Sequence, residues 1–64
     1  MQKQLFTNWK GDNVSFVANN ITALVASKEN VEETMVFVVG SGDPFYCSES
    51  YDLISQKLEI CLRE

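Results

Sequence analysis

The run Thr34-Met35-Val36-Phe37-Val38-Val39 decides the fold. It is rich in β-branched and aromatic residues, which pack well on the pleated surface of a strand. Its apolar residues follow one another without alternation, so both faces of the strand carry apolar side chains. This pattern is typical of a strand that is central in its sheet or covered on both sides. We therefore expect the other elements to be arranged around a β-strand at residues 34–39.

Shorter strand patterns lie on both sides of this run. Upstream, Gln4–Trp9 alternates in character, Val14–Ala18 forms a return strand, and Ile21–Ser27 forms a third. Downstream, Phe45–Cys47 is a short last strand. Pro44 precedes it, and since proline cannot donate to a ladder, it fits the start of a strand or a sheet edge.

Turn-forming residues separate these strands. Lys10-Gly11-Asp12-Asn13 predicts a hairpin turn in which Gly11 takes a positive φ, and Asn19-Asn20 interrupts the chain before the third strand. The polar stretch Lys28–Glu33 predicts an exposed hairpin loop, and Gly40–Pro44 a further turn. The glycines of that turn lack the Gly-Lys-Ser/Thr ending of a phosphate-binding loop.

The segment that begins at Ser48 is the one predicted helix. We expect Ser48 to cap it and the carboxylates of Glu49 and Asp52 to lie in its first turn, where the helix dipole favours negative charge. At 100° per residue, one narrow arc of the helix collects the predicted core stripe. Its members are Tyr51, Ile54, Leu58, Cys61 and Leu62.

Leu53 and Ile60 are seven residues apart and fall together on the opposite face, close to Lys57. One interpretation is that they are simply exposed, as many apolar residues are. The other is that Leu53, Lys57 and Ile60 form an interface with a second copy or another protein. A chain of 64 residues buries too little surface for more than marginal stability, so we expect a homo-oligomer.

The composition excludes most chemistry. The chain has no histidine and a net charge of −4, with 5 basic and 9 acidic residues. Without histidine the commonest general base and metal ligand are missing. We therefore expect no enzyme activity, no catalytic residue, no cofactor and no metal ion. The basic residues are scattered, so no nucleic-acid partner is expected either.

The N-terminal residues do not form the apolar run of a signal peptide, and no segment is long enough to span a membrane. We therefore expect a soluble, cytoplasmic protein with no membrane contact. If Ser48–Cys61 is helical, Cys47 and Cys61 lie about 20 Å apart, too far for a disulfide. The pair then indicates a reducing compartment. The alternative for Cys47, just before a helix, is a reactive thiol.

Glu29, Glu32 and Glu33 form the densest acidic cluster. It is interpreted as a solvated loop, and the alternative is a docking site for a basic partner.

The order of these signals resembles that of the flagellar FlbD/SwrD-like family of very small proteins. The residues that carry the resemblance are a turn at Asn8–Gly11, Asn19-Asn20-Ile21 at the start of a third strand, Val36–Val39, a turn at Gly40–Asp43, and the junction Tyr46-Cys47-Ser48-Glu49-Ser50-Tyr51. The turn asparagine and glycine are spread wider here than in the family, and the loop at 28–33 is longer and more acidic. Small phage and prophage proteins have a similar pattern. The resemblance implies a β-meander with a C-terminal helix and no catalytic residues.

Together these observations predict a single α+β domain over residues 1–64. It contains an antiparallel meander of four to five strands, as a small curved sheet or partial barrel, with one C-terminal amphipathic helix. The predicted function is that of a non-enzymatic interaction or adaptor protein that self-associates, of phage or prophage origin in one version. One alternative is an oligomer that binds a metabolite or nucleotide between subunits, with Lys10 and Lys28 as cations near turns. The other is an acidic inhibitor of a basic protein surface.

Overall fold

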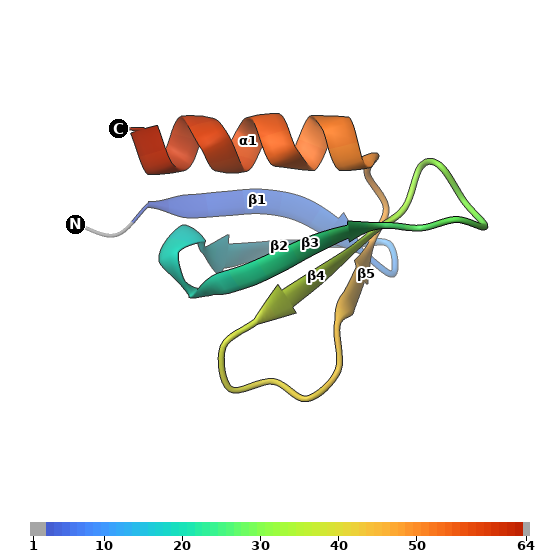
Figure 1. Cartoon of the computed structure of the whole chain (residues 1–64), viewed down its shortest axis with the longest axis horizontal. Helices are drawn as coiled ribbons and strands as arrows, with labels where there is room; N and C mark the ends of the chain where they lie inside the picture. Colours follow the sequence, from blue (N-terminus) through green and yellow to red (C-terminus); the bar gives the residue numbers. More distant parts are fainter. Residues whose placement is uncertain (1–2, 64) are drawn as a thin grey trace.

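A five-stranded antiparallel sheet carries one helix on one of its faces (Figure 1). The structure is a computed structural model, and it describes residues 3–63. Its elements are β1 (Gln4–Trp9), β2 (Asp12–Val17), the 3-10 helix η1 (Ala18–Asn20), β3 (Ile21–Ala26), β4 (Thr34–Val38), β5 (Phe45–Cys47) and α1 (Tyr51–Arg63). The strand order is β2-β1-β5-β4-β3, and the sheet is not closed. The predicted α+β class with a meander-like sheet is confirmed.

The hairpin β1–β2 has a tighter turn than predicted. Trp9 pairs with Asp12, so the loop consists of Lys10 and Gly11 alone, and residues 12 and 13 belong to β2. Both loop residues have positive φ, 54° and 84°, as a two-residue type I′ turn requires. The Lys10 ammonium lies 5.0 Å from the centre of the Trp9 ring, a cation–π contact on the same hairpin.

β4 is paired on both of its edges. β3 lies along one edge, from Ile21 opposite Val38 to Ala26 opposite Thr34, and β5 lies along the other. The prediction of a central strand is therefore confirmed, although β4 ends at Val38 and the Val39 side chain is 62% exposed. The residues predicted to interrupt the chain before β3 form the end of η1.

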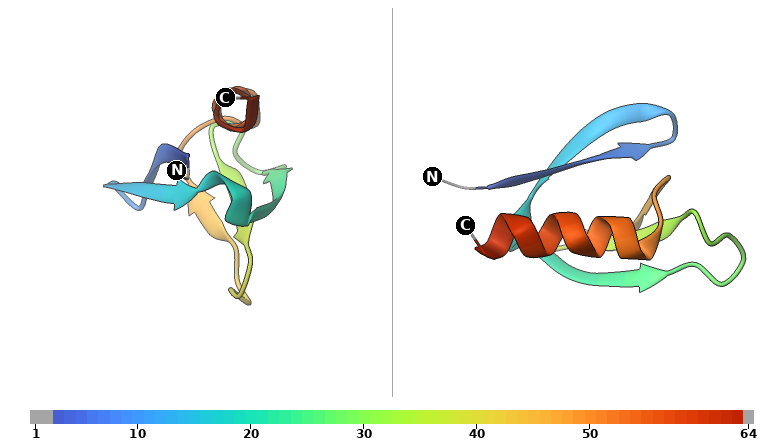
Figure 2. Two further views of the ribbon diagram at one scale, coloured as in Figure 1. Left: turned by 90° about the vertical axis from the view of Figure 1, so that its left-hand side faces the viewer. Right: turned by 90° about the horizontal axis from the view of Figure 1, so that it is seen from above.

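The sheet is strongly bent because β1 and β5 pair only where Trp9 meets Cys47. In the view along the helix, the hairpin β1–β2 lies on one side and β3 on the other, with α1 above the space between them (Figure 2). The core fills this space. Its fully buried members are Leu5, Val36, Cys47 and Ile54, each no more than 1% exposed.

Half-buried side chains surround this centre, namely Phe16, Ile21, Leu24, Val38, Phe45, Leu58 and Cys61. The predicted helix stripe is thus confirmed for Ile54, Leu58 and Cys61. It is wrong for Tyr51 and Leu62, which are 41% and 55% exposed. Because α1 contacts β1 on one side and β3 and η1 on the other, its buried arc is centred on Ile54 and leaves these two residues at the margin.

The helix begins two residues later than its predicted cap implies. The Ser50 hydroxyl accepts a hydrogen bond from the Leu53 N–H at 3.3 Å, so Ser50 and not Ser48 is the N-cap. The Ser48 N–H instead donates to the Asn8 carbonyl at 2.7 Å and continues the contact between β5 and β1. Glu49 therefore precedes the helix. No helix in the described part of the chain is long and apolar enough to cross a membrane.

Candidate functional site

The edge of β1 that faces away from β2 is covered by the C-terminal part of the chain. Alternate carbonyls of a strand point to the same edge. Here the Asn8 carbonyl accepts from Ser48 N–H at 2.7 Å, the Phe6 carbonyl from Lys57 Nζ at 3.1 Å and the Gln4 carbonyl from Cys61 Sγ at 3.4 Å. Two strand residues span about 6.6 Å and four helix residues about 6 Å. The spacing of Lys57 and Cys61 therefore matches the spacing of the carbonyls.

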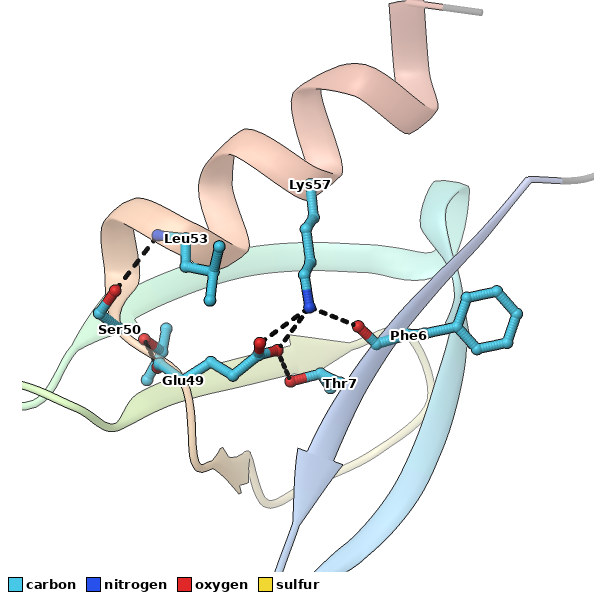
Figure 3. Close-up of polar contacts among 7 residues, drawn as sticks. Phe6, Thr7, Glu49, Ser50, Leu53 and Lys57 are labelled. Carbon is cyan, nitrogen blue, oxygen red and sulfur yellow. Dashed lines mark hydrogen bonds and ion pairs between the residues drawn. The ribbon is translucent and has the colours of Figure 1, made fainter.

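Glu49 is the centre of a polar cluster beneath the first turns of α1 (Figure 3). Lys57 Nζ lies 2.9 and 2.8 Å from its two carboxylate oxygens, and the Thr7 hydroxyl donates to Oε1. The backbone carbonyl of Glu49 accepts from the Thr34 hydroxyl at 2.8 Å. Thr7 is 7% exposed and Thr34 is fully buried, so both hydroxyls are satisfied inside the molecule. We call these four residues the Glu49 cluster.

The charges of this cluster change the acidity of two groups. Burial acts to raise the pKa of the Glu49 carboxyl, but hydrogen bonds from Lys57 and Thr7, together with the Lys57 charge, outweigh it and hold that pKa below its usual value. For Cys47, burial and the nearby Glu49 charge raise the pKa of the thiol to about 11, against a smaller lowering effect of the Thr7 hydrogen bond. Burial and a raised pKa both lower the fraction of accessible thiolate, which is evidence against the alternative of a reactive Cys47.

A polar pocket of about 560 Å³ lies beside this cluster. It is lined by Phe6, Thr7, Asn8, Asn13, Val14, Ser15, Glu49 and Lys57. Its cation is Lys57, whose ammonium already contacts the Glu49 carboxylate and the Phe6 carbonyl. An ammonium has three donors, so little of its hydrogen-bonding capacity is left for a ligand. The amides of Asn8 and Asn13 and the hydroxyl of Ser15 suit an uncharged polar molecule better than an anion.

The structure places the three predicted interface residues on one flank of α1. Leu53 is 43% exposed and Ile60 is 53% exposed. Lys57 lies on the same side of the helix, and its ammonium reaches the Phe6 carbonyl of β1. We call Leu53, Lys57 and Ile60 the helix flank. Lys57 differs from its neighbours because its ammonium turns inward to Glu49. That this flank is an interface stays a prediction.

The acidic loop between β3 and β4 is exposed and projects beyond the sheet (Figure 1). Its shape is held locally, since Asn30 accepts from the Glu32 N–H at 3.0 Å and the Asn30 N–H donates to the Ser27 hydroxyl at 3.2 Å. Val31 is 81% exposed between the predicted acidic residues Glu29, Glu32 and Glu33. The loop ends at Glu33, and the next residue is Thr34, whose hydroxyl belongs to the Glu49 cluster.

Both cysteines are free, Cys47 buried and Cys61 half-buried. Within residues 3–63, no three or more cysteine, aspartate or glutamate side chains are grouped in a way that could hold a metal ion. Neither finding supplies a catalytic centre.

Comparison with family models, curated proteins and solved structures finds no match for this chain. The resemblance to the FlbD/SwrD-like family therefore stays a prediction. The site must be interpreted from its own geometry, in which sequence reasoning missed Thr7, Thr34 and the central position of Glu49. The available signal was that both threonines stand at positions facing the core in predicted strands, where a hydroxyl needs a partner.

Proposed function

We propose that this protein is a non-enzymatic interaction protein that associates with a second copy of itself through the helix flank. The observation that carries the proposal is the exposure of Leu53 and Ile60, 43% and 53%, on a helix whose other apolar side is already used by the core. Seven residues correspond to about two helical turns, so the two side chains lie on one line parallel to the helix axis.

A two-fold contact suits this arrangement. Two antiparallel copies of the flank would place Leu53 of each chain against Ile60 of the other, which is the self-complementarity that a two-fold interface requires. Lys57 lies between them in sequence, so the two Lys57 side chains would face each other across the contact. The ion pair of each Lys57 with Glu49, at 2.8 Å, reduces the repulsion between the two ammonium groups. The aliphatic stem of Lys57 then adds apolar surface.

The small core supports association. Among the described residues, the buried apolar side chains are Leu5, Ala18, Val36, Cys47 and Ile54. Burial of a further apolar face would compensate for the small core. The two free thiols support a reducing compartment, and we place the assembly in the cytoplasm.

Sedimentation analysis of the double variant Leu53→Asp/Ile60→Asp tests the proposal. We expect the native chain to sediment as a multiple of 7.2 kDa at micromolar concentration and the variant as a smaller particle. Leu62→Asp is the matched control, because Leu62 is 55% exposed on the other margin of the helix. A native particle of 7.2 kDa, or an assembly that both sets of variants leave unchanged, would contradict the proposal.

Binding of a small molecule is the second candidate function, favoured by the pocket of about 560 Å³. This volume lies within the range of about 300–1,000 Å³ that is usual for ligand sites. Because Lys57 is paired, we expect neutral polar compounds rather than nucleotides to bind. A thermal-shift screen with both classes distinguishes them, with Asn13→Ala as the variant that should remove the response.

A further inference from the structure

β2 lies at the outer margin of the sheet, with no described segment beyond it (Figure 2). One of its edges pairs with β1 over its whole length, from Asp12 opposite Trp9 to Val17 opposite Gln4. The other edge is free.

The register shows which backbone groups the free edge presents. The Ala18 N–H donates to the Lys3 carbonyl at 2.9 Å, so the pair of residues 3 and 18 is of the hydrogen-bonded type. In an antiparallel ladder these pairs alternate with pairs that point their N–H and C=O groups outward. By this alternation Asn13 and Ser15 point both their N–H and their C=O groups toward the free edge. Val17 points its N–H group toward the same edge.

This edge lacks the devices by which proteins usually block strand addition. Such devices are proline, lysine, a bulge or a very short strand. β3, the strand at the opposite margin, has an irregular register between Ile21 and Ala23. β2 is six residues long with an unbroken register, and its only charged residue is Asp12, next to the turn.

An apolar groove of about 330 Å³ lies between the second half of β2, η1, the end of β4 and the start of β5. It is lined by Ser15, Phe16, Val17, Asn20, Val38, Val39 and Phe45. The Phe45 ring forms its wall and is fixed by edge-to-face contacts with Phe16, at 5.2 Å between ring centres, and with Trp9, at 5.0 Å. A strand added to β2 would therefore gain backbone hydrogen bonds at its edge and an apolar site for alternate side chains.

We propose that the occupant of this edge is β2 of a second copy, antiparallel, with the two-fold axis at Ser15. In this register the two Ser15 residues exchange reciprocal backbone hydrogen bonds, and the Val17 N–H of each chain donates to the Asn13 carbonyl of the other. Val14 of the added strand then lies beside Phe16, at the groove wall formed by Phe45.

This register keeps like charges of the two copies apart. The chain has a net charge of −4, so most of its surface repels a second copy. With Ser15 opposite Ser15, however, the position opposite Asp12 falls beyond Val17, where β2 ends, so no two like charges stand opposite each other across the ladder. This contact is distinct from the helix flank, and either can exist without the other.

Ser15→Pro is the direct test. Proline removes the central N–H donor but is tolerated where that N–H faces solvent on an edge strand, so the hairpin should still form. Ala26→Pro is the matched control. The Ser27 N–H donates to Glu33 at 3.3 Å, which by the same alternation directs the Ala26 N–H to the free edge of β3.

The experiment is sedimentation analysis in the Leu53→Asp/Ile60→Asp background, where the helix flank no longer contributes. We expect twice the 7.2 kDa mass in that background and with Ala26→Pro added, and 7.2 kDa with Ser15→Pro added. Ser15→Lys should act like Ser15→Pro, because it sets like charges opposite each other, and it keeps the test valid if the proline variant does not fold. The proposal is wrong if the background variant is already a 7.2 kDa particle or if Ser15→Lys leaves its mass at twice that value. These outcomes are independent of whether the helix flank is an interface.

Discussion

Replacing Lys57 by methionine should destabilise the protein in a way that depends on pH. Methionine keeps most of the apolar stem of lysine and removes only the ammonium. The Glu49 carboxylate, whose side chain is 19% exposed, would lose its cationic partner, and the Phe6 carbonyl would lose a donor at 3.1 Å. The Thr7 hydroxyl would remain as a donor to the carboxylate.

The expected loss is about 1–2 kcal/mol at neutral pH. Fully exposed ion pairs contribute about 0.2–1 kcal/mol, whereas hydrogen bonds to charged groups inside proteins contribute about 1.5–3 kcal/mol. The pair of Lys57 and Glu49 lies between these cases, with side chains 37% and 19% exposed, so solvent screening lowers the upper figure. For a domain of this size a loss in this range lowers Tm by about 10 °C.

Urea unfolding followed by Trp9 fluorescence measures the loss, at one fixed protein concentration because association also stabilises the folded chain. The pKa of Glu49 is lower in the folded state than in the unfolded chain, where it is about 4.3. The stabilisation by its pairing is therefore complete above the unfolded pKa and is lost as the pH falls through the folded pKa. We expect the difference between native protein and variant to be full at pH near 7 and to shrink in strong acid.

Arg63→Met is the matched control. It also replaces a cation on α1 that pairs with a glutamate, but the side chains of Arg63 and Glu59 are both 68% exposed. Its effect should be close to neutral. Equal stability of the Lys57→Met variant and the native protein at neutral pH would refute the role assigned to the Glu49 cluster. A difference that persists unchanged in strong acid would refute the electrostatic explanation.

Two further predictions concern the start of the helix and the buried thiol. Ser50→Ala should lower the free energy of unfolding by about 1 kcal/mol, which is the usual effect of losing an N-cap. Ser48→Ala should have little effect, because Ser48 contacts Asn8 through its backbone N–H. Urea unfolding of both variants compares the two losses, and a larger loss for Ser48→Ala would show that Ser48 is the cap. Iodoacetamide should label Cys61 well before Cys47 in the folded protein at mildly alkaline pH, since Cys47 is fully buried and its pKa is raised to about 11. Mass spectrometry of the labelled peptides over time gives both rates, and equal rates would contradict this assignment.

The sequence predicts the elements of this fold well because each strand satisfies its pattern locally. Gln4–Trp9 and Phe45–Cys47 have the predicted bounds, and Thr34–Val38 is central, as its two apolar faces indicated. The helix start was wrong because Ser48 and Ser50 are equally good caps in isolation. The choice between them depends on the hydrogen bond from Ser48 to Asn8, a residue on a distant strand.

The Glu49 cluster was harder to foresee for the same reason. A glutamate just before a helix reads as a partner of the helix dipole, and a lysine on the helix as a solvated cation. Only the packing of α1 along the edge of β1 brings Lys57 to the Phe6 carbonyl and to Glu49. The pattern of α1 placed Lys57 near Leu53 and Ile60 correctly, but not the inward turn of its ammonium.

The free edge of β2 shows where local patterns end. Ser15 alternates with Val14 and Phe16, so the sequence pattern assigns its side chain to the other face of the strand, and it assigns Asn13 to the hairpin turn. Which backbone groups are unpaired depends on the order of the strands in the sheet. In that order β1 lies between β2 and β5, and β5 comes about thirty residues after β2 in the sequence. A strand without lysine, proline or a bulge is unremarkable in the middle of a sheet, but at a margin it exposes backbone donors and acceptors to any other strand. The same six residues therefore indicate an interface only once the strand order is known.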